Sequence, residues 1–197
     1  MLIALIVAIL AYLIGSISSA ILLSKIFGLE DPRKVGSGNP GATNVLRSGN
    51  KKAAALTLLG DMLKGFLPVF LVSLLSDSAV LLALTALGAF LGHLYPIYYG
   101  FKGGKGVATM LGIFLALKPF TFVAMGLVWL IVAKVFKFSS LASLAAAGTA
   151  LLFSFFSASI PLLGATFGIV ALLFWKHKEN IERLKAGIES KIGDKTD

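Results

Sequence analysis

The residues best suited to chemistry lie in a polar, glycine-rich stretch at positions 36–47, inside a chain that is otherwise strongly apolar. Three glycines within six residues let the backbone turn tightly and approach a ligand closely. Asn39 is a typical helix N-cap and Pro40 a typical first helical residue, so we expect a helix to begin there. Free N–H groups at a helix N-terminus bind anions such as phosphate. The stretch contains no carboxylate, and we therefore expect a phosphate site.

Side chains of this stretch complete the expected site. We expect Ser37, Gly36, Gly38, Asn39 and Thr43 to surround one phosphate. Asn44 and Arg47 are three residues apart, so they share a helix face and can reach the same ligand. The guanidinium of Arg47 matches two phosphate oxygens at once. The alternative is a plain connecting loop whose glycines serve only the turn. The glycine spacing also matches a dinucleotide-binding fingerprint. That motif needs a strand before it, and both flanks here indicate apolar helices, which argues against it.

Composition places this stretch in a membrane protein. The chain is 57% hydrophobic and only 14% charged, which is typical of integral membrane proteins and not of soluble domains. It contains no cysteine, so disulfides and thiolate nucleophiles are excluded. With two histidines and no cysteine we expect no metal site. We likewise expect no cofactor and no nucleic-acid partner.

Seven apolar segments predict an all-α integral membrane protein, a bundle of seven transmembrane helices that forms a single domain over residues 1–197. The segments fall near 2–27, 54–76, 79–99, 106–117, 120–136, 139–157 and 160–176. The fourth is short, because about eleven residues rise only ~16 Å and a bilayer core is ~30 Å thick. With seven spans, the loops that carry nearly all lysines and arginines share one side with the C-terminal tail, Lys64 and Lys118 excepted. The positive-inside rule makes that side cytoplasmic and places the N-terminus outside.

A second glycine-rich stretch, 100–109, repeats the chemistry of the first at the predicted cytoplasmic side. We expect Lys102 and Lys105 to neutralise phosphate or the charge developing on a carbonyl, with Gly103, Gly104 and Thr109 beside them. Anchoring at a membrane surface would explain two lysines, although not the four glycines around them. The stretch is one residue short of a Walker A loop and has Gly106 where a magnesium-binding hydroxyl belongs, which argues against ATP hydrolysis.

Further polar residues cluster in the tail and inside two apolar segments. His177 and Asn180 share a helix face with Arg183 next along it, and a basic tail lying on anionic lipid is the alternative. Asp61 and Lys64 lie within the second segment, where ionisable residues suggest function, or a neutralised pair that braces the loop above. His93, near the end of the third segment, could act as a base or fasten the neighbouring loop.

Residues 36–47, 92–109 and 177–189 resemble the three cytoplasmic motifs of the bacterial acyl-phosphate:glycerol-3-phosphate acyltransferases, a family of seven-helix membrane enzymes. The resemblance covers essentially the whole chain, with the motifs in the same order. It implies transfer of a fatty acyl group from acyl phosphate to the 1-hydroxyl of glycerol 3-phosphate, giving lysophosphatidic acid and phosphate in phospholipid biosynthesis. It also implies that neither acyl-CoA nor acyl carrier protein is the donor. We expect acyl phosphate, glycerol 3-phosphate and membrane lipid as partners of a monomer in the inner membrane.

The expected catalytic residues are Ser37, Arg47, Lys105, His177 and Asn180. No hydroxyl in the sequence has an obvious base beside it, so we expect direct attack by the substrate hydroxyl. We expect the first loop to hold acyl phosphate, and the lysines and tail to hold glycerol 3-phosphate. The donor phosphate would take the proton while His177 orients the acceptor. The competing hypothesis is an organic-phosphate transporter, against which we note that no inverted repeat is visible and the polar residues gather on one side.

Overall fold

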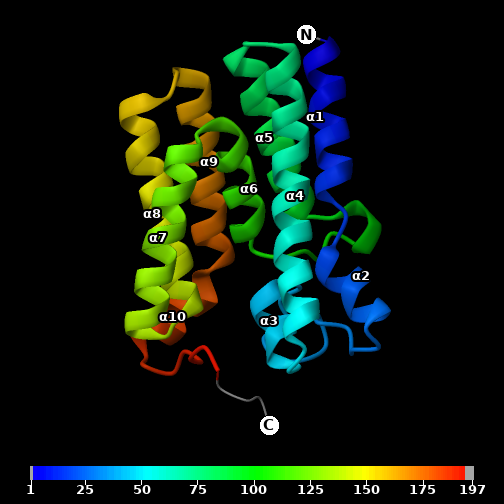
Figure 1. The fold of residues 1–197 in the computed structure, drawn as a ribbon, viewed down its shortest axis with the longest axis vertical. Helices are drawn as coiled ribbons and strands as arrows, with labels where there is room; N and C mark the ends of the chain where they lie inside the picture. The colour runs from blue at the N-terminus through cyan, green and yellow to red at the C-terminus, as the bar shows by residue number, and fades with distance from the viewer. Residues whose placement is uncertain (1, 194–197) are drawn as a thin grey trace.

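The computed structural model describes residues 2–193, and every regular element in that range is helical. Figure 1 shows the start of α1 at one end of the bundle and α10 at the other. Five segments are long and apolar enough to cross a membrane, and a sixth is added when α9 and α10 are counted as one bent span. The prediction of an all-helical membrane protein is confirmed, whereas the described residues do not contain seven helices of spanning length.

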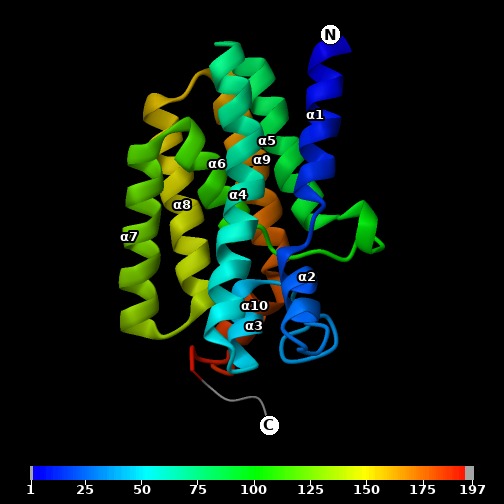
Figure 2. The ribbon, with the colours of Figure 1, turned by 45° about the vertical axis from the view of Figure 1, so that its right-hand side comes forward.

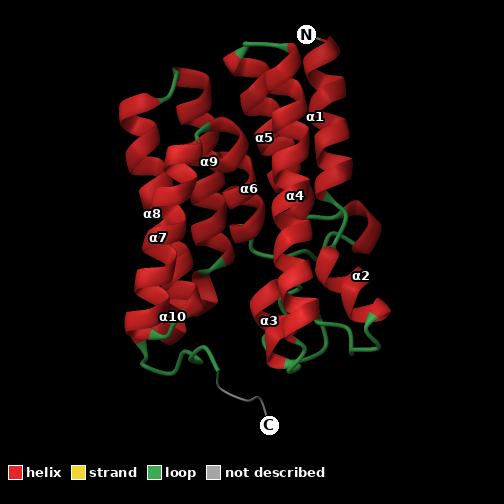
Figure 3. Cartoon of the chain, viewed as in Figure 1, coloured by secondary structure: helices red, strands yellow, loops and turns green. Residues whose placement is uncertain are grey.

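The elements follow one another as a series of antiparallel crossings with short surface helices between them. Their bounds are α1 (Leu2–Gly15), α2 (Ser19–Ile26), α3 (Ala42–Arg47), α4 (Lys51–Leu75), α5 (Ala79–Leu94), the 3₁₀ helix η1 (Ile97–Tyr99), α6 (Val107–Leu117), α7 (Pro119–Phe136), α8 (Ser139–Ser157), α9 (Ile160–Lys176) and α10 (Lys178–Lys185). Figure 3 shows α2, α3 and α10 gathered with their loops at one end, which we call the basic end. The turns at 76–78 and 158–159, at the opposite end, carry no lysine or arginine.

The predicted first helix is interrupted at residues 16–18, where α1 ends and α2 begins. Serines favour such a break because their hydroxyls compete for backbone groups. The Ser16 hydroxyl donates to the Tyr12 carbonyl at 2.8 Å, and the Ser18 hydroxyl caps α2 by accepting from the amide of Ile21. The segment predicted over 2–27 is therefore present as Leu2–Ile26 and is long enough to cross a membrane, but it consists of two helices and not one. The break is tolerated because hydroxyls within the apolar run satisfy backbone groups that it exposes.

The third predicted helix is long enough to cross a membrane over Ala79–Tyr99, although its regular α-helical part is shorter, whereas the fourth is below spanning length. α5 ends at Leu94 because Pro96 disfavours helical geometry in the residue before it, Tyr95. α6 has 11 residues and stops before Lys118 and Pro119, at which α7 starts. The fourth segment is therefore a short helix, as its length in the sequence predicted, and α7 follows it directly.

Glycines set the closest helix contacts. A Cβ at Gly15 of α1 would overlap the carbonyl oxygen of Ala89 in α5, and a Cβ at Gly112 of α6 would overlap that of Met62 in α4. Small residues at such positions let the backbones of membrane helices approach closely. Consequently α6 packs directly on α4, while its other side contacts α7, which pairs with α8. Figure 2 shows α7 and α8 side by side, with α6 between α7 and α4.

Candidate active site

A cavity of about 660 Å³ is lined by residues from the basic end of the bundle and by residues further along α4, α6 and α7. The first glycine-rich loop and α3 form one wall, and α4, α6, α7, α8 and α10 supply the others. Of the residues predicted from the sequence, those that line it are Gly36, Ser37, Asn39, Thr43, Asn44, Arg47, Asp61, His93, Lys105, His177, Asn180 and Arg183. Those outside its lining are Gly38, Lys64, Lys102, Gly103, Gly104 and Thr109. The fold therefore brings residues from all three predicted clusters to one cavity.

The first loop is held in shape by the buried side chain of Asn44. Its amide nitrogen donates to the carbonyls of Pro32 and Val35, at 2.8 and 3.0 Å, and its oxygen accepts from the amide of Ser37 at 2.9 Å. Gly36 has a φ of +59°, and a Cβ there would overlap the Asn44 oxygen, so only glycine fits. The polar atoms of Asn44, which we expected to reach the ligand, therefore hold the loop in position instead.

The helix after this loop begins later than predicted. α3 starts at Ala42 with Gly41 as its N-cap, and no side chain caps it. The expectation of a helix capped by Asn39 is therefore wrong; Asn39 lines the cavity instead. The amides of Ser37, Gly38 and Gly41 are already hydrogen-bonded within the chain. Anion recognition by this wall consequently depends on side chains such as Arg47 more than on those three amides.

Three cations face one another across the cavity: Arg47 from α3, Lys105 from the second loop and Arg183 from α10. Burial, together with the charges of Arg183 and Arg47, lowers the pKa of Lys105 below the usual lysine value. Glu189 partly offsets these effects. Mutual repulsion of this kind is relieved when an anion binds between the cations, so the cluster is suited to phosphate.

A chain of hydrogen bonds fixes Lys105 and the tail. The Lys105 ammonium donates to the oxygen of Asn180, whose nitrogen donates to Glu189 at 2.6 Å. Glu189 also accepts from Ser140 at 2.7 Å and forms an ion pair with Arg183 at 2.7 Å. Burial raises the pKa of Glu189, but these three hydrogen bonds and the Arg183 charge outweigh it and lower the pKa overall. Glu189 is therefore an anion that orients Asn180 and Arg183 toward the cavity.

His177 lies between α9 and α10 with its ring buried. Its Nδ1 is 2.8 Å from the carbonyl oxygen of Leu173. A carbonyl can only accept, so Nδ1 carries the hydrogen and the Nε2 of the neutral ring is free to accept one. The ring is held in place to orient a substrate hydroxyl or to act as a base.

Lys105 and Gly106 of the second loop line the cavity, and other residues of the loop support them. Lys102 is exposed and does not line the cavity, so it does not join Lys105 at the site. The amide of Gly104 donates to the His93 carbonyl at 3.2 Å, and a Cβ on Gly104 would overlap the His93 ring. Thr109 is buried against α4, where a Cβ at Gly65 would overlap its carbonyl oxygen. Glycine at 104 therefore serves the contact with His93, and His93 fastens this loop.

Sequence reasoning assigned no role to several residues of the site. Ser139, Ser140 and Ser143 line the cavity from the start of α8, and the Trp129 indole donates to the Ser143 hydroxyl at 3.2 Å. The Ser139 hydroxyl lies 3.2 Å from that of Thr43. A cluster of three hydroxyls at one end of an apolar helix was visible in the sequence and would have indicated this wall. Glu189 was recognisable only as part of a motif, and its contact with Ser140, 49 positions away, depends on how α8 and the tail pack.

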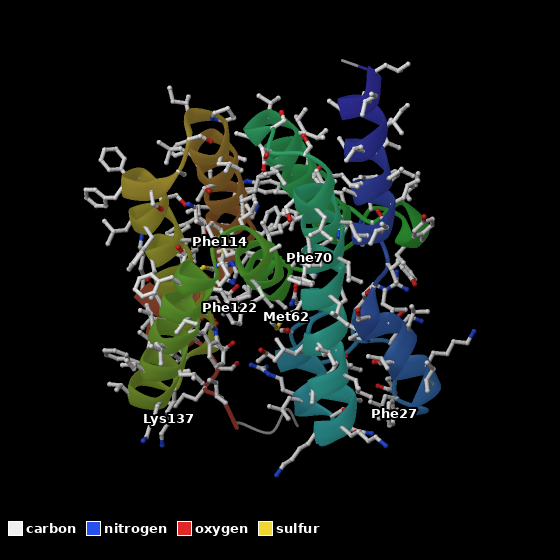
Figure 4. The ribbon with its side chains drawn as sticks, turned by 45° about the horizontal axis from the view of Figure 1, so that its top comes forward. Phe27, Met62, Phe70, Phe114, Phe122 and Lys137 are labelled. Atoms are coloured by element: carbon white, nitrogen blue, oxygen red, sulfur yellow. The ribbon has the colours of Figure 1, made fainter. Side chains whose placement is uncertain are left out.

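The cavity continues from the cationic residues into an apolar groove. Its walls are Leu58 and Met62 of α4, Val107, Ala108 and Leu111 of α6, and Phe122, Gly126 and Leu130 of α7. Met62 of α4 and Phe122 of α7, both labelled in Figure 4, line this groove from two different helices. The cavity can thus hold one molecule that has both an anionic head and an apolar tail.

Fold and cavity together define an integral membrane protein with a polar, cationic site that opens into the apolar part of the bundle. A family model described as glycerol-3-phosphate acyltransferase matches residues 5–187, and the chain belongs to this family. It is 54% identical to the glycerol-3-phosphate acyltransferase of Bordetella petrii, covering 94% of this chain and 92% of the relative. Identity to that of Neisseria meningitidis is also 54%, covering 93% and 94%.

Two crystal structures of PlsY, an integral membrane glycerol 3-phosphate acyltransferase, share this fold. The glycerol 3-phosphate form has a TM-score of 0.92 and 43% sequence identity, covering 96% of both chains. The lysophosphatidic acid form has a TM-score of 0.90 and 41% identity, covering 96% of this chain and 95% of that one. The resemblance read from the three sequence motifs is therefore confirmed at the level of the family.

Proposed function

We propose that this protein transfers a fatty acyl group from acyl phosphate to the 1-hydroxyl of glycerol 3-phosphate, releasing lysophosphatidic acid and inorganic phosphate. The observation that carries the proposal is the cavity in which Arg47, Lys105 and Arg183 meet an apolar groove. Both substrates carry a phosphate, and the donor also has a long apolar chain. The related structures named for glycerol 3-phosphate and lysophosphatidic acid support the same acceptor and product.

The acyl transfer proceeds by direct attack of the substrate hydroxyl on the donor carbonyl. Within residues 2–193, neither a histidine nor a carboxylate hydrogen-bonds to the Ser37 hydroxyl, so this serine lacks the partner of an activated nucleophile. The new ester bond forms as the bond from the carbonyl carbon to the phosphate oxygen breaks. Phosphate is a good leaving group, and the cations need only hold both substrates and neutralise charge.

The hydroxyl proton passes to the donor phosphate, directly or through water, while His177 orients glycerol 3-phosphate. The first loop with Arg47 holds the acyl phosphate, and Lys105 with Asn180 and Arg183 holds the acceptor. The three cations that surround the cavity suit this assignment, because they stabilise anionic oxygens next to the attacking hydroxyl. Ser37 and Thr43 supply neutral hydrogen bonds to the same phosphate.

We place the basic end at the cytoplasmic face of the inner membrane, and we propose that the protein acts as a monomer. The positive-inside rule supports this orientation, since the opposite turns carry no positive charge. Glycerol 3-phosphate would then enter from the cytoplasm, and the donor chain would lie at the level of the inner leaflet.

The test is a single-turnover experiment with purified protein in detergent. We expect phosphate to be released only when palmitoyl phosphate and glycerol 3-phosphate are both present, with lysophosphatidic acid formed in equal amount. Palmitoyl-CoA and palmitoyl-acyl carrier protein are tested in place of palmitoyl phosphate, and neither should give product. Product formation from either of them, or phosphate release without the acceptor, would refute the proposed reaction. Uptake of glycerol 3-phosphate by sealed vesicles in the absence of a donor would indicate the transporter instead.

A further inference from the structure

Gly126 of α7 differs from the glycines that pack the other membrane helices. At Gly15, Gly65, Gly88, Gly92 and Gly112 an added Cβ would overlap a carbonyl oxygen of the facing helix. At Gly126 nothing lies within 4 Å of such a Cβ. Its backbone is helical, with no positive φ. Neither packing within the chain nor local backbone conformation therefore requires glycine here.

A glycine in the interior of a helix is also unfavourable, because it is more flexible than alanine in the unfolded chain. The structural consequence of Gly126 that we find is free space on the wall of the catalytic cavity, which this residue lines. Gly148 and Gly164 also leave free space beside their backbones, but of these three glycines Gly126 alone lines the catalytic cavity, so its space is available to a ligand bound there. The location of Gly126 along the cavity then identifies the part of the ligand concerned.

Gly126 lies in the apolar part of the cavity, just beyond its polar end. Trp129, one turn along α7, donates its indole hydrogen to Ser143 and so marks the polar boundary. Three residues of helix place Gly126 about 4.5 Å further from that boundary, and Phe122 lies about one more turn along. Leu58, Met62 and Leu111 line the groove from the facing helices α4 and α6. A chain leaving the cationic site through this groove passes Gly126.

We propose that Gly126 keeps the groove open for the acyl chain of the donor, so that the size of the side chain at position 126 determines which acyl chains are accepted. This inference rests on the proposed function and deepens it. A leucine at 126 would occupy the space beside the chain and expel the methylenes beyond it. Two displaced methylenes correspond to about tenfold in binding, and a short chain has fewer to lose.

The experiment compares Gly126→Ala, Gly126→Leu and wild type with octanoyl and palmitoyl phosphate as donors. Gly148→Leu is the matched control, since Gly148 also has nothing within 4 Å of its Cβ but lies exposed on α8, outside the cavity. We expect Gly126→Leu to lower the ratio of kcat/KM for palmitoyl over octanoyl phosphate at least about tenfold. Gly126→Ala should lower it less, and the control should leave it unchanged. The KM for glycerol 3-phosphate should stay near the wild-type value in all of them.

An unchanged donor ratio in Gly126→Leu, with the variant folded and active, would overturn the inference and leave the proposed function standing. A wild type inactive with both acyl phosphates would instead refute the donor. In that case the role of Gly126 is tested by binding of palmitoyl and octanoyl lysophosphatidate, monitored by tryptophan fluorescence. We expect the same selective loss of the longer ligand in Gly126→Leu, and equal affinities for each ligand in variant and wild type would overturn the inference.

Discussion

The ammonium of Lys64 in α4 donates a hydrogen bond to the carbonyl oxygen of Ile17 at 2.8 Å, within the break between α1 and α2. The same ammonium lies 2.8 Å from the Asp61 carboxylate, and the two side chains are only 6% and 3% exposed. A pair of charges inside a membrane bundle is costly unless its hydrogen-bonding capacity is used. Here the pair satisfies a backbone carbonyl that the broken helix leaves free.

Replacing Lys64 by methionine should therefore destabilise the protein strongly. The change leaves Asp61 buried without its cation and the Ile17 carbonyl without its donor, at a cost of about 3–5 kcal/mol. Thermal unfolding in detergent measures the effect. The double variant Lys64→Met with Asp61→Asn removes both charges and should recover part of the loss. Equal melting temperatures for Lys64→Met and wild type would refute this role.

Arg47→Lys should lose most of the activity although the charge is kept. Lysine acts as a point charge and cannot bind two phosphate oxygens in one plane. We expect a loss of about 2–4 kcal/mol in transition-state stabilisation, by analogy with the removal of one oxyanion donor. The measurement is kcat/KM for both substrates. Arg33→Lys is a control at a residue that pairs with Asp31 and does not line the cavity, and it should remain near wild type. Near-normal turnover by Arg47→Lys would contradict the assignment.

Gly104→Ala should impair catalysis by moving its neighbours. The added Cβ would overlap the His93 ring and lie 3.0 Å from the Pro40 carbonyl oxygen. Both the second loop and its Lys105 would shift, so we expect activity to fall while the protein stays folded. Adding His93→Ala removes the overlap, and the double variant should be more active than the product of the two single effects predicts. If the activity of the double variant equals the product of the two single effects, the loss in Gly104→Ala does not come from the overlap with His93.

His177→Ala should mainly raise the KM for glycerol 3-phosphate if the residue orients the acceptor. A general base typically contributes 10²–10⁴-fold to kcat, and a fall of that size with an unchanged KM would make His177 the base. The measurement is kcat against pH at saturating glycerol 3-phosphate. Under the substrate-assisted mechanism kcat of His177→Ala should keep the pH dependence of the wild type, whereas a general base at position 177 would give the wild type an acidic limb that the variant lacks.

Phosphate affinity should weaken as the pH rises, because Lys105 loses its proton at a lower pH than an ordinary lysine. Burial is the main cause of its lowered pKa. Bound phosphate prefers the charged ammonium, so the KM for glycerol 3-phosphate is lowest below the pKa of Lys105 and increases through it. Lys105→Arg keeps its charge at every accessible pH and should flatten this alkaline limb, whatever its overall activity. An identical limb in Lys105→Arg would assign the titration to another group.

The class of protein and the residues of the three polar clusters follow from the amino-acid sequence. Long apolar runs need a bilayer around them, and the uneven distribution of lysine and arginine is a property of the chain that no packing changes. The glycine-rich motifs were recognisable because Gly, Asn and Arg act through their own backbone and side-chain chemistry. Hence the sequence alone identifies Arg47, Lys105, His177 and Asn180 as candidate site residues.

Which of these residues come into contact, and what each one does there, depends on the packing of the helices. Lys105 and Asn180 are 75 positions apart, and Lys64 and Ile17 are 47 positions apart, so their contacts depend on how the helices pack. The same holds for Asn44, whose polar atoms are taken by the loop, and for Gly126, whose empty surroundings no local pattern can reveal. Local preferences act over a few residues, whereas a cavity is formed by helices that are distant in sequence.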